Sequence, residues 1–263
     1  MNVYVMTDME GISGISSREQ CRSGGVAWEA AKALMEADFN AAVAGASAGG
    51  ASRIVLNDAH GGGDGNIRLE KMDGRAEYER PQGGANMMPA LNDGKFDVGF
   101  HVGAHAMAGT LDAFLCHTQS SASWHNYRVN GERWGEIAQF AAYMGHFGVP
   151  LVLVTGDDAA CREARELLGD EIETVAVKSA VGRQRARCLS PAAARERIQE
   201  AAARAIRLGE KVKPFRPAFP AEVDFEFNSS EFADRAACSP GVERINGRTV
   251  RKVARNAREL VGW

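Results

Sequence analysis

Short apolar segments rich in β-branched residues alternate along this chain with segments of helical periodicity. The clearest case is VPLVLVTGDD (149–158), which is followed by the helical segment AACREARELLG (159–169) and the apolar run ETVAVKSA (173–180). Parallel strands that are buried on both faces have such continuous apolar sequences, and the helices that connect them cover the sheet. The pattern therefore predicts an α/β fold with a mostly parallel sheet and helices on both of its faces.

Other segments repeat the pattern. We expect helices over about 27–48, where two glycines follow, and over WGEIAQFAAYMGHFG (134–148). The remaining predicted strands of the sheet are residues 2–6, SRIVLNDAH (52–60) and FDVGFHVGAH (96–105), and DAFLCHTQ (112–119) is predicted as another strand or an edge piece.

The pattern changes after about Arg187. Ser190 is a suitable N-cap and Pro191 a suitable first residue for a helix, and a proline-spaced stretch follows this helix. The strands EVDFEFN (222–228) and VERINGRTVRKVA (242–254) come last. We expect two domains, an α/β domain over 1–187 and a smaller α+β domain over 188–263.

Composition and charge exclude several classes of protein. The 263 residues carry a net charge of −3 without a basic stripe, so nucleic acid is not an expected partner. The apolar runs are too short to span a bilayer, and no signal peptide is recognised. The five cysteines are widely spaced and odd in number, which favours free thiols and a cytoplasmic location.

Acids and histidines follow the predicted strands. Asp8 and Glu10 come after the first strand, and His60 and His105 follow two others. The carboxyl ends of parallel strands lie at one edge of a sheet, so these side chains should converge there. Two buried acids without a neighbouring Lys or Arg would be costly, and a divalent cation removes that cost. Gly11 would let the backbone bend so that both acids reach one centre.

The ligand types indicate which cation is bound. Imidazole combined with carboxylate favours zinc, with manganese or cobalt as alternatives, over calcium or magnesium. Glu136, at the start of a predicted helix, is a further candidate ligand. Five ligands are too many for one open zinc site but suit two metals about 3.5–4 Å apart with one bridging carboxylate. The predicted metal ligands are Asp8, Glu10, His60, His105 and Glu136.

Each of these residues also has a structural interpretation. The two N-terminal acids could cap a helix, Glu136 could be an acid stabilised by a helix N-terminus, and the histidines could lie in turns or pack in strands. A glycine-rich loop at 61–65 could hold phosphate, although it lacks the lysine of a P-loop. Cys116 is not expected to be a nucleophile that pairs with His117, because neighbouring strand residues point to opposite faces. We expect structural roles for His101, His125 and His146.

With these residues in place, the sequence resembles the M55 family of zinc peptidases. The resemblance runs through most of the chain and is densest in DMEGISG (8–14), NDAH (57–60), GAHA (103–106), RCLSPA (187–192) and KVKPF (211–215). Met6 departs from the family pattern, which has serine at that position. The resemblance implies metal ligation by the five predicted ligands with Asp8 as the bridge, a catalytic role for His117, and ring-shaped homo-oligomers, decamers in the family.

The expected function is that of a binuclear zinc aminopeptidase with two zinc ions per subunit. It would remove the N-terminal residue from short peptides or aminoacyl amides, with a D-configured residue suggested by the resemblance. His117 would act as general acid/base or as an oxyanion donor, although the family histidine has also been called a nucleophile. Two alternatives are a metallo-amidohydrolase that acts on non-peptide amides and a non-catalytic peptide-binding protein.

Overall fold

The computed structural model describes residues 1–61, 65–81 and 86–260. Part of the glycine-rich loop predicted at 61–65 lies outside these described residues. Within them, none of the helices is both long enough and apolar enough to cross a membrane.

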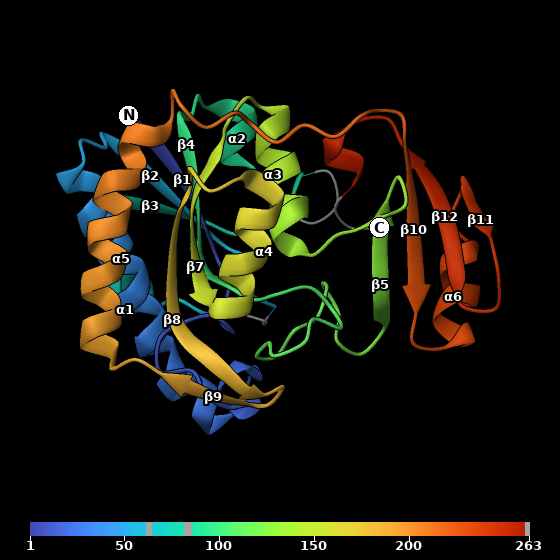
Figure 1. Cartoon of the computed structure of the whole chain (residues 1–263), viewed down its shortest axis with the longest axis horizontal. Helices are drawn as coiled ribbons and strands as arrows, with labels where there is room; N and C mark the ends of the chain where they lie inside the picture. Colours follow the sequence, from blue (N-terminus) through green and yellow to red (C-terminus); the bar gives the residue numbers. More distant parts are fainter. Residues whose placement is uncertain (62–64, 82–85, 261–263) are drawn as a thin grey trace.

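A seven-stranded sheet forms the centre of the molecule (Figure 1). Its strand order is β3-β2-β1-β4-β7-β8-β9, and all neighbouring strands are parallel except β8 and β9. The four central residues of β1, VYVM, are fully buried, as their continuous apolar sequence predicts. The strands are β1 (Asn2–Thr7), β2 (Arg53–Asp58), β3 (Ala76–Glu79), β4 (Val98–Ala104), β7 (Leu151–Asp157), β8 (Glu173–Gly182) and β9 (Arg185–Cys188).

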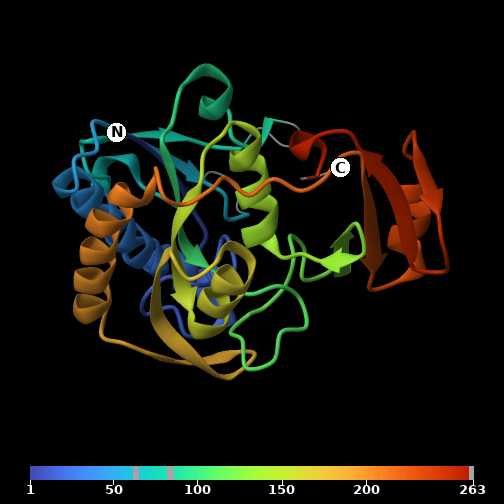
Figure 2. The same ribbon diagram turned by 45° about the horizontal axis from the view of Figure 1, so that its top comes forward.

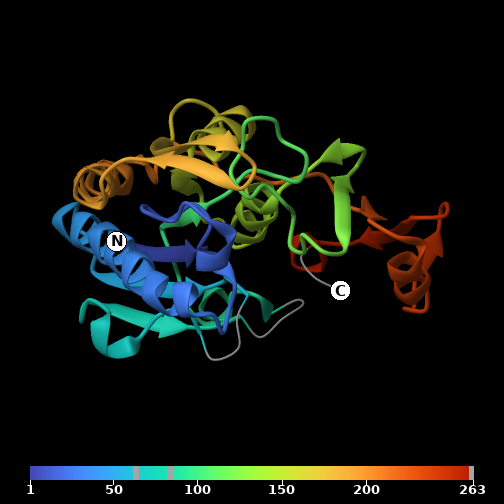
Figure 3. The same ribbon diagram turned by 90° about the horizontal axis from the view of Figure 1, so that it is seen from below.

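Two pairs of helices cover the two faces of this sheet (Figures 1 and 3). One pair is α1 (Val26–Ala48) and α5 (Pro191–Ala205), and the other is α3 (Glu136–His146) and α4 (Asp158–Leu168). Helices α1 and α5 approach closely at Gly45, where a Cβ would overlap the carbonyl oxygen of Gln199. The Oγ of Ser190 accepts a hydrogen bond from the Ala193 amide at 3.3 Å, which confirms the predicted N-cap.

A second, antiparallel sheet lies beside α3 at the far end of the molecule from α1 and α5 (Figures 1 and 3). Its order is β11-β12-β10-β5-β6, and Trp124, Tyr127 and Phe225 pack their rings at centroid distances of 4.8 to 5.6 Å. Its strands and helix are β5 (Trp124–Val129), β6 (Glu132–Arg133), β10 (Ala221–Phe227), β11 (Val242–Arg244), β12 (Thr249–Ala254) and α6 (Ser230–Ala237). The short helices are η1 (Arg18–Cys21), η2 (Leu69–Lys71), α2 (Ala90–Asp93), η4 (Ile206–Leu208) and η5 (Ala257–Glu259).

The two sheets do not divide the chain at residues 187 and 188. Helix α5 belongs to the second predicted domain but packs on α1, and β5 and β6 belong to the first but pair within the five-stranded sheet. The α/β class and the mostly parallel sheet with helices are as predicted.

The strand predicted over 112–119 is wrong. This segment is part of a loop between β4 and β5, drawn in green in Figure 2. Asp112, Leu115 and Gln119 have φ angles of 50°, 48° and 58°, which turn the chain away from an extended path. The apolar residues that suggested a strand are buried against neighbouring elements without sheet pairing.

Candidate metal centre

The first loop of the centre begins where β1 ends. The Asp8 amide donates to Val102 O at 2.9 Å and the Gly11 amide to Gly103 O at 2.8 Å, so the loop lies directly on the end of β4. A Cβ on Gly11 would overlap the carbonyl of Ala104. Glycine is therefore required here for close approach, which fixes both acids of this loop over the carboxyl edge of the sheet.

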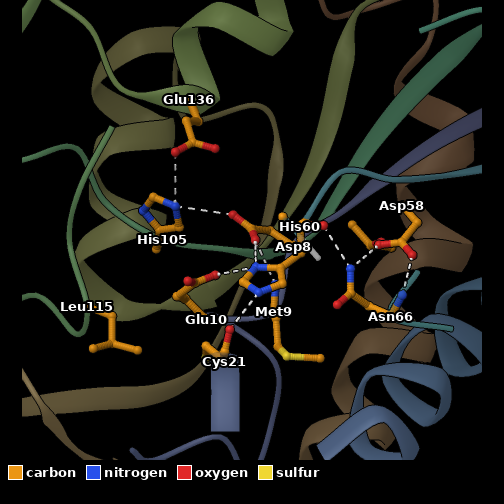
Figure 4. Close-up of polar contacts among 12 residues, drawn as sticks. Asp8, Met9, Glu10, Cys21, Asp58, His60, Asn66, His105, Leu115 and Glu136 are labelled. Carbon is orange, nitrogen blue, oxygen red and sulfur yellow. Dashed lines mark hydrogen bonds and ion pairs between the residues drawn. The ribbon is translucent and has the colours of Figure 1, made fainter. Parts of the chain in front are cut away.

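His60 follows β2 and faces both acids. Its Nδ1 lies 2.9 Å from Asp8 Oδ1 and 3.2 Å from Glu10 Oε2 (Figure 4). Its Nε2 lies 2.9 Å from the carbonyl oxygen of Cys21. A carbonyl can only accept, so Nε2 carries a proton and donates it there. In the neutral imidazole this leaves the Nδ1 lone pair directed at the acids.

His105 follows β4 and faces the other oxygen of Asp8. Its Nε2 lies 3.2 Å from Asp8 Oδ2 and 3.3 Å from Glu136 Oε1, at the first residue of α3 (Figure 4). Its Nδ1 donates to the carbonyl of Ala106 at 3.0 Å. Asp8 therefore stands between two histidines and offers one oxygen to each.

His117 comes from the β4–β5 loop and stacks on His105, with ring centroids 4.0 Å apart and an interplanar angle of 12°. Its Nδ1 donates to Leu115 O at 2.7 Å, and its Nε2 lies 4.0 Å from Glu136 Oε1. Leu115 holds a left-handed φ of 48°, a conformation that leucine rarely adopts. This backbone conformation places the carbonyl that orients the His117 ring.

Two acids, one at the N-cap of α4 and one within α4, accept hydrogen bonds from backbone amides of this loop. Asp157, the N-cap of α4, accepts hydrogen bonds from the amides of Phe114 at 2.7 Å and Ala160 at 2.8 Å. Glu163 accepts from the Met107 amide at 2.7 Å, and burial raises its pKa to about 7. Neither residue was predicted from the sequence, although Asp157 could have been found as the residue that precedes the α4 helix.

The acids of the centre are buried without a basic partner among the described residues. Asp8, Glu10 and Glu136 are 5%, 6% and 8% exposed. The nearest buried cation, Lys178, donates its Nζ to the carbonyl oxygens of Glu10 and Ile15 at 2.6 and 2.7 Å, and not to a carboxylate. The charges of the three carboxylates are therefore met only by imidazoles.

These contacts shift the pKa values in opposite directions. Burial alone would raise the pKa of Asp8, but the imidazoles of His105 and His60, which face its two oxygens, hold it well below its usual range. Burial alone would lower the pKa of each of these two histidines. The carboxylates of Glu10 and Asp8 raise the pKa of His60 well above its usual value, and those of Glu136 and Asp8 do the same for His105. The imidazoles of His60 and His105 thus supply the positive charge that cations would otherwise supply among the acids.

The donor set fits two metal ions. One group of possible ligands is Asp8, Glu10 and His60, and the other is His105, His117 and Glu136; within each group the ligand atoms lie within 4.8 Å of one another. The buried Glu10 Oε2 and His105 Nε2 make no hydrogen bond to any of the described residues. Each of the three histidines donates its other nitrogen to a backbone carbonyl, the arrangement typical of metal-ligating imidazoles.

The structure brings all five predicted ligands and His117 into one cluster. The family model described as D-aminopeptidase, peptidase family M55, matches residues 1–263. The chain belongs to the M55 peptidase family. Membership makes it a hydrolase of peptide bonds.

Two comparisons agree with this assignment. A D-aminopeptidase of Bacillus subtilis (strain 168) is 32% identical over 253 residues, which are 95% of this chain and 89% of the relative. A solved structure, described as the Zn-dependent D-aminopeptidase DppA from Bacillus subtilis, a self-compartmentalizing protease, superposes with a TM-score of 0.91. It is 30% identical, and the match covers 99% of this chain and 94% of that one.

Two cavities flank the cluster in this M55 peptidase. One, of about 370 Å³, is lined by Asp8, His60 and Glu136 together with the small residues Ala59 and Gly61. The other, of about 450 Å³, is lined by Glu10 and by a group of arginines. His117 and Cys21 line both cavities, so the cluster lies between them.

The remaining histidines lie outside the cluster. His101 is buried in β4 with its ring edge-on to Phe140, His125 is exposed on β5, and His146 is the last residue of α3. Cys116 Sγ lies 3.6 Å from the carbonyl of Thr110. Cys116 and His117 are not the strand neighbours that the sequence pattern predicts, yet Cys116 Sγ faces Thr110 O and His117 Nδ1 faces Leu115 O.

Proposed function

We propose that this M55 peptidase is a zinc-dependent D-aminopeptidase with two zinc ions per subunit. The observation that carries the proposal is the position of Asp8, whose two carboxylate oxygens face two different histidines at 2.9 and 3.2 Å. A carboxylate in this position can bridge two cations. The zinc dependence of the structurally similar DppA supports the choice of metal.

The ligands divide between the two ions as the two groups of side chains do. Glu10 and His60 would hold the first zinc, His105 and Glu136 would hold the second, and Asp8 would contribute one carboxylate oxygen to each. The backbone carbonyls behind the histidines fix the tautomers that ligation needs. Glu136 stands at the helix N-terminus of α3, where the backbone dipole favours its ionised form.

When bound, the two zinc ions supply a water activated at neutral pH and polarise the scissile carbonyl. The cavity that contains Asp8 and Glu136 would receive the N-terminal residue, because none of the described residues that line it is a Lys or Arg that would repel the α-amino group. Ala59 and Gly61 in the same wall place no long side chain in this cavity. These residues orient the substrate with its N-terminus toward the smaller cavity and its leaving group toward the larger one.

We assign general acid/base catalysis to His117. Its Nδ1–H is held by the carbonyl of Leu115, so Nε2 is the nitrogen that exchanges a proton with the reactants. As the C–N bond breaks, this nitrogen delivers a proton to the departing amine, and the new C–O bond leaves a free amino acid. The stacked His105 ring holds the imidazole in place.

We further propose that the enzyme works in the cytoplasm as a ring-shaped homo-oligomer, a decamer. Support comes from the self-compartmentalizing relative and from the five cysteines, all of which are free thiols. Light scattering on the purified protein tests the subunit number.

The central experiment compares two buried acids that lie close together. Glu136→Gln removes a proposed ligand, whereas Glu163→Gln changes a neighbouring buried acid to which no ligation is assigned. Zinc content and cleavage of D-alanyl and L-alanyl peptides are measured for both, with N-acetylated and cyclic amides as further substrates. We expect about two zinc ions and D-selective cleavage in wild type and Glu163→Gln, and loss of zinc and activity in Glu136→Gln. Cleavage of acylated or cyclic amides in preference to free N-termini would contradict the aminopeptidase.

A further inference from the structure

The larger cavity has a wall that the chemistry assigned above does not use. This cavity of about 450 Å³ is lined by Glu10 and His117, which lie beside the proposed reacting atoms. Its outer wall contains three guanidinium groups from two distant parts of the chain. They belong to Arg18 and Arg22, in and just after η1, and to Arg183, in the β8–β9 turn.

The guanidinium groups give this wall a positive charge. Over the described part of the chain, no carboxylate lies within ion-pair distance of Arg18 or Arg22, whereas Arg183 donates to the carbonyl of Cys116 at 3.0 Å. The cavity also contains Glu10, whose carboxylate faces His60, and Glu19. The smaller cavity has no such wall: none of the described residues that line it is a Lys or Arg, and its two acids, Asp8 and Glu136, are proposed zinc ligands.

The backbone segment that carries Arg18 and Arg22 is held at a fixed position relative to the metal centre. Gln20 Oε1 accepts hydrogen bonds from the amides of Ser16 and Ser17 at 2.8 and 3.1 Å, which fixes the start of η1. Cys21, the last residue of η1, is buried and holds His60 through its carbonyl oxygen. The segment that carries Arg18 and Arg22 is therefore connected directly to a proposed ligand.

We propose that Arg18 and Arg22, assisted by Arg183, bind the C-terminal carboxylate of a dipeptide or tripeptide substrate. This inference rests on the proposed aminopeptidase and adds its substrate class: short peptides with a free carboxylate. The arginine wall takes the C-terminal carboxylate, and the smaller cavity, which has no such wall, takes the N-terminal residue, so the carboxylate selects one orientation of the peptide. One or two residues beyond the scissile bond, each about 3.5 Å long when extended, would separate the carboxylate from the reacting atoms.

The test uses two substrates that differ only at the C-terminus, D-alanylglycine and D-alanylglycinamide. Both contain the same scissile bond, but only the first carries a carboxylate. The variant is Arg18→Gln/Arg22→Gln, since both arginines are exposed and neither forms an ion pair with any described residue. The matched control is Arg197→Gln, an exposed arginine on α5 outside the cavity.

We expect wild type to prefer the free peptide, and the double variant to lose about tenfold in kcat/KM on it through a higher KM, as expected for loss of a charge-assisted contact. Cleavage of the amide should stay unchanged in all three proteins, which also shows that the variant is folded and loaded with zinc. Added salt should raise the KM of wild type for the peptide alone.

Two results overturn the inference and leave the proposed function intact. They are equal kcat/KM values for peptide and amide in wild type, and an unchanged preference in the double variant. A zinc-loaded wild type that cleaves neither compound contradicts the proposed function itself, and the inference fails with it.

Discussion

The two sheets of the molecule neutralise their carboxylates differently. In the five-stranded sheet, Asp224 accepts two hydrogen bonds from Arg251 at 2.6 and 2.8 Å, and Glu226 pairs with Arg248 at 3.0 Å. These pairs are partly exposed to solvent and lie between neighbouring strands. Each acid has its counter-charge within the chain, so this sheet needs no ion from outside.

The carboxyl edge of the seven-stranded sheet lacks such partners. Asp8, Glu10 and Glu136 are more deeply buried than the acids of the other sheet, yet they face only histidines. Burying charge in this way is costly unless a cation arrives. The difference indicates that the ion pairs of the five-stranded sheet serve the stability of the chain alone, whereas the acids at the carboxyl edge of the seven-stranded sheet serve a ligand. Substitutions should separate these two roles.

The largest effect is expected from Asp8→Asn. An amide cannot give one anionic oxygen to each of two cations, so both zinc ions should be lost and kcat/KM should fall by about 10³-fold or more. Atomic absorption and peptide cleavage measure the two outcomes. If the variant retained two zinc ions, Asp8 would not be the bridge.

His117→Ala should separate metal binding from catalysis at the same edge. We expect zinc content to stay near that of wild type, while kcat falls by about 10²- to 10⁴-fold because the general acid/base is missing. His125→Ala, at an exposed position on β5, serves as the control. Loss of one zinc ion in His117→Ala would instead make this histidine a ligand, a role that its position beside Glu136 also permits.

The sequence was sufficient to predict the parallel sheet and the cluster because both depend on local patterns. Buried parallel strands are continuous apolar runs, and residues that follow such strands meet at one edge whatever the connections between them. The β4–β5 loop was not predictable in this way. Its buried Phe114 and Leu115 mimic a strand, and only hydrogen bonds to Asp157 and to the Arg183 carbonyl show where the segment lies.

The domain boundary and the arginine wall escaped prediction for a related reason. Nothing in the local sequence of 124–133 shows that it pairs with β10, which lies about ninety residues later, by registers such as Val129 with Val223. Arg18 and Arg183 likewise meet at one cavity only after the chain has folded. Long-range contacts of this kind leave no periodic signal.

A second comparison, within the seven-stranded sheet, is between His101 and His105. His101 is buried like His105, but neither of its nitrogens has a hydrogen-bond partner within the part of the chain that the structure describes, and burial lowers its pKa from 6.5 to about 4. The native state then binds fewer protons than the unfolded state between these pH values. Its contribution to stability is complete above pH 6.5 and decreases as the pH falls toward 4.

His101→Leu should therefore reduce the acid sensitivity of the metal-free protein. Between pH 6.5 and pH 4, wild type should lose about 3 kcal/mol more unfolding free energy than the variant, as the pKa difference requires. Urea titrations at both pH values, with chelator present, give the difference, and His146→Gln at an exposed helix end provides the control. Parallel losses in wild type and His101→Leu would show that His101 is not the group that titrates.

The smallest effect should come from the five-stranded sheet. Asp224→Asn removes the charge that pairs with Arg251, and because the arginine side chain is 33% exposed, the cost should be about 1 kcal/mol of unfolding free energy. Zinc content and kcat/KM should not change, since no side chain of this pair lines either cavity beside the metal centre. Urea unfolding of the zinc-loaded protein at low and high salt measures the cost, which salt should reduce. If Asp224→Asn lost zinc or activity, the two sheets would be coupled, and the division between a structural edge and a ligand-binding edge would not hold.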